Sequence, residues 1–468
     1  MTADSVRAAA RELAFLHQRF APLFGRCESR EHSRIYIEGL LLGQGRKSVE
    51  PMALMFAPRT NDRACSQLEV LGLQRFLTDS PWQTSDVQGE IQTVFGERLV
   101  PTTAQWSLGT VGVIDESSFV KRGSHSVGVA RQHCGRLGKV ENCQVGVFLV
   151  GVTPGGTALL DHQLYLPEEW TDDSERCRKA RVPIGQAFAT KVEIARTLLE
   201  RCQVRFDWIT ADDLYGRNGE WLNALEARGQ RYVVEVPSNT RVWIDDPTRW
   251  LGNESAHRRP TKRIERAAVR NARQIEQALP PEAWRAVKLR EGAAGPLVFM
   301  MARVRCWATR HRKAGPPVWL VIQRSLEAEP QIRYWLSNAD ANTPLETLAG
   351  VMGCRWRVEE FFEDAKGSVG MADYEARAWT SWHHHMSLVA LAHLYVILTR
   401  QQLQEHTPKL TLDMALRLLQ AALPRPALTE EHALDLVSYH LQRNAVAQAS
   451  HRKTWLKKHE TVAQQLLL

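Results

Sequence analysis

The sequence predicts an α/β protein, with a mixed β-sheet at its centre, a β-rich insertion and helical regions at both ends. Three observations predict this class. Helical periodicity dominates the first 100 residues, β-like runs and a strand, helix, strand unit occupy residues 108–237, and helical periodicity returns after residue 343. With 468 residues, the chain is long enough for two to four domains.

Residues 1–104 are expected to form a helical domain. Apolar side chains recur every three or four positions within residues 3–24, which is the spacing of one face of a helix. Shorter helical stretches follow at residues 31–43, 66–78 and 87–98, and the turn-forming sequence SPW lies between the last two.

Residues 105–237 are expected to form a sheet that begins antiparallel and becomes parallel. The first three strands are expected at residues 108–115, 143–153 and 157–167, and the turn sequence PGG joins the last two. A helix at 184–203 then precedes a strand that ends at Asp212, the helix GEWLNALEARG and the strand RYVVEVP. A strand, a helix and a strand in this spacing form a parallel βαβ unit.

Residues 238–340 are expected to form a basic, β-rich insertion, because short β-like runs alternate there with basic loops. Residues 251–315 contain 15 Lys and Arg residues but only 5 Glu residues, a net charge of +10 in a chain whose total is +8. Such a block favours a polyanionic partner, since each phosphate that Lys or Arg neutralises releases counterions. A charge run is, however, more often an ordinary solvated surface than a binding site.

The residues after the insertion are expected to be helical, as a second part of the core at 341–400 and a C-terminal region at 401–468. Thr343 is the expected N-cap of a helix that runs to Gly367, with Glu346 as its capping partner. The sequence WHHHMSLVALAHLYVILT is the most apolar helix. Its three consecutive histidines cannot face one metal ion from a helix, so we expect a structural role or a polar surface for His383, His384 and His385.

Two classes of protein are disfavoured by the composition. No segment contains the roughly 18 uncharged apolar residues of a transmembrane helix, and acids precede the first apolar run at the N-terminus. The eight cysteines include no C-x-x-C pair, which disfavours a structural zinc site or a disulfide framework. We therefore expect a cytoplasmic protein with reduced thiols and no membrane association.

Three acidic residues are candidate ligands of a divalent cation. Asp115 and Asp212 are expected at the ends of strands, and Glu359 lies on the helix RWRVEEFFEDAK. Carboxylates at the strand ends of a mixed sheet, joined by one from a packed helix, are typical of Mg²⁺ sites that act in phosphoryl transfer. Taken singly, each has an ordinary explanation, because an Asp often caps a helix or forms a turn and a helical Glu often forms a surface ion pair.

Arg355, Glu359 and Lys366 are spaced by four and seven residues, so they share one face of a helix. An Arg and a Lys that flank a metal-binding Glu can hold phosphates beside the bond that is cut. A simple ion pair between Arg355 and Glu359 explains the same spacing equally well.

Six ordered segments resemble the DDE transposases of the insertion-sequence 4 superfamily, and most closely the insertion-sequence 701 family. The resemblance extends from about residue 34 to residue 400. The segments are YIEGLLLGQGRKSVEPMA, LQRFLTDSPW, VIDESSFVKRGSHSVGVARQHCGRLGKVENCQVGV, LYLPEEW, TADDLYG and RWRVEEFFEDAKGSVGMADYEAR.

The resemblance implies a ribonuclease H-like core interrupted by the β-rich insertion, with Asp115, Asp212 and Glu359 as the catalytic acids that hold two Mg²⁺ ions, for which Mn²⁺ would substitute. The helix signature of the superfamily, Y-x2-R-x3-E-x6-K, is matched by Arg355, Glu359 and Lys366. Met352 stands at the Tyr position and cannot donate a hydrogen bond to a phosphate.

In the doublet Asp212-Asp213, the two side chains of an extended strand would point to opposite faces. The family pattern Ala-Asp-x-x-Tyr-Gly selects Asp212 as the catalytic acid. Asp213 is then the expected cap of the following helix.

Other positions have weaker family support. Lys121, Arg122 and His125 follow the first acid and are candidate contacts to the DNA backbone, although a solvated basic turn is an equal alternative. Arg131 and Lys139 are weaker candidates. Five tryptophans of the insertion are candidate base-stacking residues, but packing in a small β core is the better expectation for each: Trp243, Trp250, Trp284, Trp307 and Trp319.

The predicted function is transposition. The protein would bind the terminal inverted repeats of an insertion sequence through its N-terminal helices and basic insertion, cut the ends and join the 3′ ends to target DNA. A homodimer would bring two ends together in the bacterial cytoplasm, on the nucleoid when DNA is bound. Two alternatives stay open: a transposase-like repressor that binds DNA without cutting it, and a nuclease without strand transfer.

Overall fold

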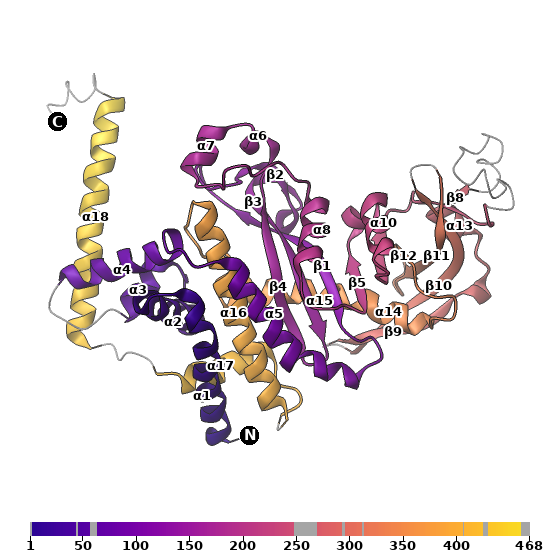
Figure 1. Ribbon diagram of the computed structural model, residues 1–468, viewed down its shortest axis with the longest axis horizontal. Helices are drawn as coiled ribbons and strands as arrows, with labels where there is room; N and C mark the ends of the chain where they lie inside the picture. The colour runs from indigo at the N-terminus through magenta and orange to yellow at the C-terminus, as the bar shows by residue number, and fades with distance from the viewer. Residues whose placement is uncertain are drawn as a thin grey trace.

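The computed structural model describes the chain except for residues 1, 44, 57–62, 248–268, 293–294, 311–312, 406, 425–428 and 460–468. Trp250 and part of the basic block therefore lie outside the described residues. Figure 1 shows a central sheet between the N-terminal and C-terminal helices on one side and the sheet of the insertion on the other. The mixed α/β class predicted from the sequence is confirmed.

The core of the sheet has the strand order of a ribonuclease H-like fold. Antiparallel β3 pairs with both β1 and β4, and β1, β5 and β6 are parallel neighbours. Short β2 pairs with the beginning of β3. The strands are β1 (Val111–Val120), β2 (Ala130–Cys134), β3 (Lys139–Thr153), β4 (Gly156–Tyr165), β5 (Trp208–Ala211) and β6 (Tyr232–Val236).

Short helices connect these strands, and one of them corrects the sequence prediction. They are α6 (Glu168–Thr171), α7 (Ser174–Lys179), α8 (Lys191–Arg201), α9 (Asp213–Gly216) and α10 (Gly219–Ala227). The helix expected at 184–203 begins only at Lys191, with a capping box formed by Thr190 and Glu193. Pro183 and the positive φ of 84° at Gly185 explain why the residues before it are not helical.

The insertion continues the same sheet. β12 pairs antiparallel with β6, and β11, β10, β7 and β8 follow outward, while β9 pairs with β10. The elements are β7 (Arg241–Trp243), β8 (Val269–Asn271), α13 (Ala272–Ala278), β9 (Arg285–Gly292), β10 (Gly295–Arg310), β11 (Lys313–Arg324) and β12 (Ile332–Ser337). A rigid sheet therefore links the core to the insertion.

The N-terminal helices pack against the long helix α16 (Trp379–Gln404), which the chain reaches only after the insertion. Those that contact α16 are α1 (Ala3–Phe20), α2 (Cys27–Leu42), α4 (Arg63–Thr78) and α5 (Thr84–Arg98), whereas α3 (Val49–Phe56) packs on α2 and α4. Short 3₁₀ turns also occur, at Ala21–Phe24, Val100–Gln105, Gly135–Leu137 and Pro281–Ala283.

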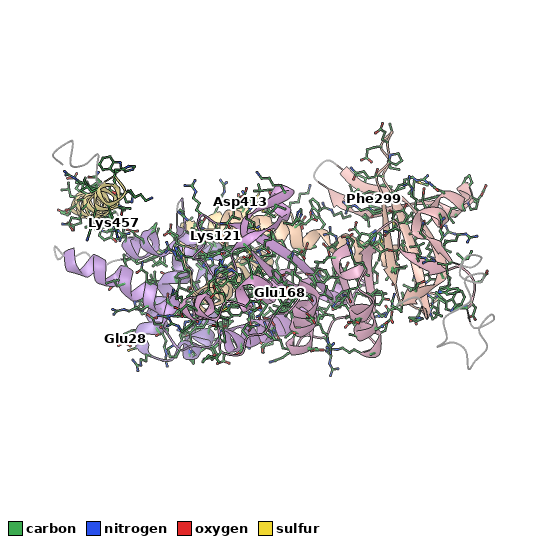
Figure 2. All side chains as sticks on the ribbon, turned by 90° about the horizontal axis from the view of Figure 1, so that it is seen from above. Glu28, Lys121, Glu168, Phe299, Asp413 and Lys457 are labelled. Atoms are coloured by element: carbon green, nitrogen blue, oxygen red, sulfur yellow. The ribbon has the colours of Figure 1, made fainter. Side chains whose placement is uncertain are left out.

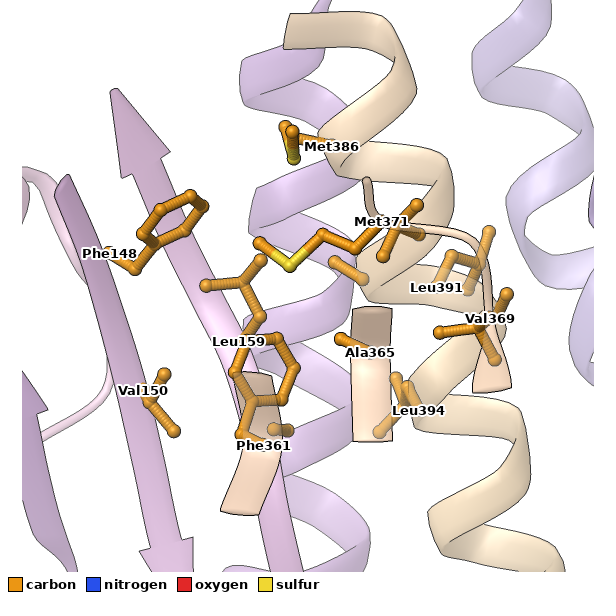
Figure 3. Packing of buried hydrophobic residues seen from close by; sticks show 14 of the residues in the cluster. Phe148, Val150, Leu159, Phe361, Ala365, Val369, Met371, Met386, Leu391 and Leu394 are labelled. Atoms are coloured by element: carbon orange, nitrogen blue, oxygen red, sulfur yellow. The ribbon is translucent and has the colours of Figure 1, made fainter. Parts of the chain in front are cut away.

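Helices α14 (Leu345–Cys354) and α15 (Trp356–Ser368) replace the single helix expected from Thr343 to Gly367. Pro344 is the N-cap and forms no side-chain capping bond, so the predicted capping by Thr343 is wrong. The helical conformation is interrupted by a turn at Arg355, between the two helices. Figure 3 shows α15 residues such as Phe361 and Ala365 between the sheet and α16, where burial of apolar area stabilises their position.

Helices α17 (Leu412–Ala422) and α18 (Glu430–Lys458) complete the chain as described. Helix α17 packs on α16, whereas α18 contains no buried residue and extends beyond the body (Figure 1). None of the described helices is long and apolar enough to cross a membrane.

Candidate active site

Asp115 lies within β1, not at its end as the sequence predicted, because β1 extends to Val120. The parallel pairing of β1 with β5 ends at the pair Ile114 and Ala211, so β1 continues beyond β5 from Asp115 onward. Asp212 is the first residue after β5. The end of β5 therefore brings the two acids to the same edge of the sheet.

Asp212 also caps the helix that follows, since its side chain accepts a 3.0 Å hydrogen bond from the backbone N–H of Leu214. The prediction that Asp213 is the cap is wrong. Asp213 is the first residue of α9, and its carboxylate forms an exposed ion pair with Arg217. The two neighbouring acids have different surroundings.

A close backbone contact explains why glycine, Gly216, occupies the last position of the TADDLYG motif. A Cβ atom at this residue would lie 1.9 Å from the backbone carbonyl oxygen of Glu235. Because only glycine lacks that atom, α9 can pack directly against β6 and hold Asp212 at the end of β5.

Glu359 approaches the two aspartates from α15, on the helical side of the sheet. The guanidinium of Arg355 lies between Glu359 and Asp115. Its Nη1 atom is 3.6 Å from Oδ2 of Asp115 and 3.3 Å from Oε1 of Glu359. The two carboxylate oxygens are therefore less than about 7 Å apart. Arg355 and Glu359 do form the ion pair that was the alternative explanation of their spacing.

Glu235 of β6 is a member of the site that the sequence did not indicate. Its Oε2 atom lies 3.3 Å from Nε of Arg355, so the guanidinium is held by acids from three elements. The motif YVVEV reads as an ordinary strand, and nothing local in it points to an arginine 120 residues later.

A second unpredicted member is Glu116. Asp115, Glu116 and Asp212 each offer a carboxylate oxygen, and these oxygens all lie within 4.8 Å of one another. Among the residues that the structure describes, this is the only group of three or more such side chains with the spacing of a metal site. Glu359 does not belong to this tighter group and reaches it through Arg355.

The electrostatics of the site favour a bound cation. Burial raises the pKa of Asp115 to about 8, with further increases from Asp212 and Glu116, and Arg355 opposes the shift. Burial raises the pKa of Asp212 to about 6, and the charge of Glu116 adds to the increase. A divalent ion between these groups would relieve the repulsion between carboxylates that share a small space.

Lys366 reaches the same strand from the last turn of α15. Its Nζ atom donates a 2.7 Å hydrogen bond to Oγ of Ser117, and burial lowers the pKa of the ammonium group to about 8. The ammonium group of Lys366 is therefore held at Ser117, which is two residues after Asp115 in β1.

Lys121, Arg122 and His125 follow β1 in a loop. Nζ of Lys121 donates a 3.0 Å hydrogen bond to the carbonyl oxygen of Tyr374 and lies 3.4 Å from the centre of its ring. Burial lowers the pKa of Lys121 to about 8. Arg122 and His125 are exposed, and the view from above in Figure 2 places Lys121 over the core of the molecule.

A hollow of about 350 Å³ adjoins Arg355 and Glu359 on the side of the insertion. It lies between the insertion sheet and helices α14 and α15, and Phe299, labelled in Figure 2, is one of its walls. Met352, the departure from the family signature, is buried in its lining. Trp356 also lines the hollow, is 46% exposed and has the Arg290 guanidinium over its ring. No pattern in the sequence distinguishes it from other tryptophans.

The other described tryptophan candidates and the three histidines all contact neighbouring protein groups. Trp243 is buried, Arg324 covers Trp284, Arg303 covers Trp319, and Trp307 packs on the small cluster of Trp243 and Val269. The three consecutive histidines are all buried in α16, so the structural role is confirmed and the polar surface is excluded: His383, His384 and His385.

Comparison with known proteins agrees with this geometry. A family model described as "DDE superfamily endonuclease" matches residues 19–296, more than half of the chain and a range that includes both aspartates. The chain is also 33% identical over 177 residues to a "Probable transposase for insertion sequence element IS701" of Microchaete diplosiphon. That match covers 37% of this chain and 42% of the relative.

The acids of the site and the family model point to the same chemistry. Members of a DDE superfamily use acidic side chains to hold divalent metal ions, and the group formed by Asp115, Glu116 and Asp212 is suited to such ions. The chain therefore belongs to the DDE superfamily of endonucleases and is related to an insertion-sequence transposase.

Proposed function

We propose that the protein is a transposase that binds the terminal inverted repeats of an insertion sequence, cuts the DNA at the ends and joins the 3′ ends to target DNA. The observation that carries the proposal is the meeting of Asp115 and Asp212 at the end of β5, with Glu359 beyond Arg355. The similarity to the IS701 transposase supports transposition over other DDE chemistry.

Asp115, Asp212 and Glu359 would hold two Mg²⁺ ions, with Mn²⁺ as a substitute. When bound, the ions would activate the attacking water or 3′-hydroxyl and stabilise the leaving oxygen. The chain's own residues perform the remaining tasks. Arg355, whose guanidinium faces three carboxylates, would hold a phosphate beside the cut bond, and Lys366 would hold the next phosphate from the last turn of α15, beside β1.

DNA would lie along basic parts of three regions. Lys121, Arg122 and His125 would contact the backbone near the cut, while the helical domain at 1–104 and the insertion at 238–340 would bind the inverted repeat. The catalytic core would comprise residues 105–237 and 341–400, with the helical region at 401–468 beside it. Exposed Arg122 and His125 support the first of these contacts.

The test is an assay with labelled element-end DNA, a target plasmid and Mg²⁺. Joined products support transposition, and cleavage without joining supports a nuclease. A shifted band without cutting supports a DNA-binding repressor and contradicts the catalytic proposal. The matched control is Glu168→Gln, which removes an exposed acid that lies on α6 and is not a member of the acidic group.

We also propose that the protein acts as a homodimer that pairs two element ends. The exposed side chains Leu434, Val437 and Leu441 lie on one face of α18, because their spacing is three and four residues. The helix is acidic in its first turns and basic in its last, so two antiparallel copies would place opposite charges together.

Light scattering tests the dimer on the full chain. The wild type is expected at twice its monomer mass of 53.1 kDa, and Leu434→Glu with Leu441→Glu at the monomer mass. Met414→Glu changes an exposed apolar side chain on α17 and is the control. A monomeric wild type would contradict the proposal.

We further propose that the protein works in the bacterial cytoplasm and associates with the nucleoid when it binds DNA. Its expected substrate supports this location. A fluorescent fusion should coincide with the stained nucleoid, and a fusion spread evenly through the cell would contradict the association.

A further inference from the structure

Glu116 is an acid of the site for which the proposed reaction has no role. Residues of a strand alternate between its two faces, so Glu116 follows Ile114 onto the face of the sheet that packs against α8 and α9. Asp115 faces the other side, toward Arg355 of the α14 and α15 junction. Both carboxylates nevertheless come within 4.8 Å of Asp212, because Asp212 leaves the sheet where β5 ends.

Two neighbours fix the carboxylate of Glu116. Nζ of Lys191, the first residue of α8, lies 2.8 Å from Oε1, and the hydroxyl of Tyr215 donates a 3.0 Å hydrogen bond to Oε2. Tyr215 is completely buried, so its ring cannot follow a moving partner. A carboxylate oxygen has two lone pairs, so each oxygen of Glu116 keeps one lone pair for another ligand.

The distribution of positive charge separates the two faces of the site. Arg355 faces Asp115 and Glu359 on one side, whereas Lys191 faces Glu116 on the other. Asp212 has neither cation as a direct partner in an ion pair among the described contacts. A divalent ion at Asp212 would therefore find oxygen ligands from both faces of the sheet.

We propose that Glu116 is a further ligand of the divalent ion held by Asp115 and Asp212, and that Lys191 and Tyr215 position it for this role. The inference rests on the proposed function, since it adds a residue to the metal site of that reaction. It also assigns a task to the Tyr of the TADDLYG motif. Tyr215 holds Glu116 in the site rather than contacting DNA.

Binding of Mn²⁺ to the full-length protein without DNA tests the inference, measured as the loss of the free Mn²⁺ signal in electron paramagnetic resonance. Glu116→Gln keeps the shape of the side chain and removes its charge, so the affinity should fall by about tenfold or more. Tyr215→Phe removes only the hydroxyl and should cause a smaller fall in the same direction. Asp213→Asn is the matched control, because Asp213 is paired with Arg217 outside the group, and its affinity should equal that of the wild type.

Unchanged Mn²⁺ affinity in Glu116→Gln would overturn the inference. If that variant does not fold, as judged by its thermal midpoint without metal, then Tyr215→Phe and Lys191→Met decide, and wild-type affinity in both would overturn it. Failure of the proposed function has a different signature, since a wild type that binds Mn²⁺ but never cuts element-end DNA would contradict only transposition. Weaker binding in Glu116→Gln together with normal binding in Asp213→Asn would support the inference.

Discussion

Asp212 and Asp213 are adjacent in the chain, but the end of β5 separates their surroundings. The carboxylate of Asp212 lies in the acidic group, and that of Asp213 lies in solvent beside Arg217. Since Asp212 also caps α9, a substitution of Asp212 tests its catalytic role alone only if the new side chain still forms the cap. Asparagine does so, because its side-chain oxygen accepts the same hydrogen bond from a backbone N–H.

Asp212→Asn is therefore expected to abolish cleavage of element-end DNA while leaving the thermal midpoint within a few degrees of the wild type. Asp213→Asn is expected to retain most of the cleavage. Rates on labelled DNA in Mg²⁺ are the measurement. Retained cleavage in Asp212→Asn, with loss in Asp213→Asn, would mean that the wrong acid of the doublet has been assigned.

The lowered pKa of Lys366 predicts a pH dependence of DNA binding. With a pKa of about 8, the ammonium is charged at pH 7 and loses its charge as the pH rises to 9. If it contacts a phosphate, the affinity of the wild type should fall by roughly threefold to tenfold over this range. Lys366→Arg stays charged and should lose this dependence, as measured by fluorescence anisotropy. Equal pH profiles for the two proteins would exclude the contact.

The sequence could predict the residues whose surroundings are local. Asp115, Asp212 and Glu359 can be predicted because each follows a recognisable pattern of strand or helix. The structure places the two aspartates together at one edge of the sheet and Glu359 beyond Arg355. Glu116 and Glu235 could not be selected, because their significance comes from partners about 100 residues away: Lys191 and Tyr215 for the first and Arg355 for the second.

At the scale of elements, the packing of α9 on β6 depends on Gly216. A Cβ at this position meets backbone rather than a flexible side chain, so the clash cannot be relieved by rotation. Gly216→Ala is expected to lower the free energy of unfolding by about 1–3 kcal/mol. Gly96→Ala, on α5 with no atom within 4 Å of the added Cβ and no positive φ, is a control for the loss of glycine without the clash.

Gly216→Ala should also weaken cleavage more than its loss of stability explains, because α9 carries the cap formed by Asp212. Urea unfolding and cleavage rates at a temperature where the variant is folded separate the two effects. A variant with normal stability and normal cleavage would contradict the assigned role of this close contact.

Helix α16 holds its histidines in the neutral form. Nδ1 of His383 donates to the carbonyl oxygen of Trp379, and Nε2 accepts from the N–H of Leu164. In His385, Nδ1 faces the hydroxyl of Tyr36 and Nε2 faces the carbonyl oxygen of Met371. Burial lowers the pKa of both to about 3.

Because these pKa values are below the ordinary value of 6.5, the unfolded chain binds protons that the folded protein does not bind between pH 6.5 and 3. Stability is therefore full above pH 6.5 and falls as the pH decreases, by up to about 1.4 kcal/mol per pH unit for each histidine. The urea midpoint should be lower at pH 5.5 than at pH 7.5. His383→Gln should show a shallower decrease than the wild type, and equal slopes would contradict the neutral, buried state of His383.

The boundaries of elements were predicted less well than their types. The strands and the βαβ unit were expected from alternation and length, and most of them are present within a few residues. The break between α14 and α15 was not expected, because no proline marks it and the ion pairs of Arg355 with β1 and β6 are visible only in three dimensions.

At the scale of the whole molecule, the sheet joins parts that the sequence separated. The insertion was expected as a distinct β-rich unit, yet β12 pairs with β6 and extends the core sheet. This pairing joins residues about 100 positions apart, and no local pattern specifies it. The N-terminal helices also pack against α16, although most of the chain separates them in sequence. The hydrophobic core that holds α15 therefore contains residues from both ends of the sequence.

Two rigid parts of the molecule flank the site: the core strands β1 and β5 with Asp115 and Asp212, and helix α15, which contains Glu359 and follows Arg355. The central claim is that these acids hold the metal ions of DNA cleavage. Anomalous diffraction from a crystal of the full chain with a cut element end and Mn²⁺ tests it most directly. Two Mn²⁺ peaks bounded by Asp115, Asp212 and Glu359 are predicted, and ordered DNA at the site without a peak beside these carboxylates would contradict the account.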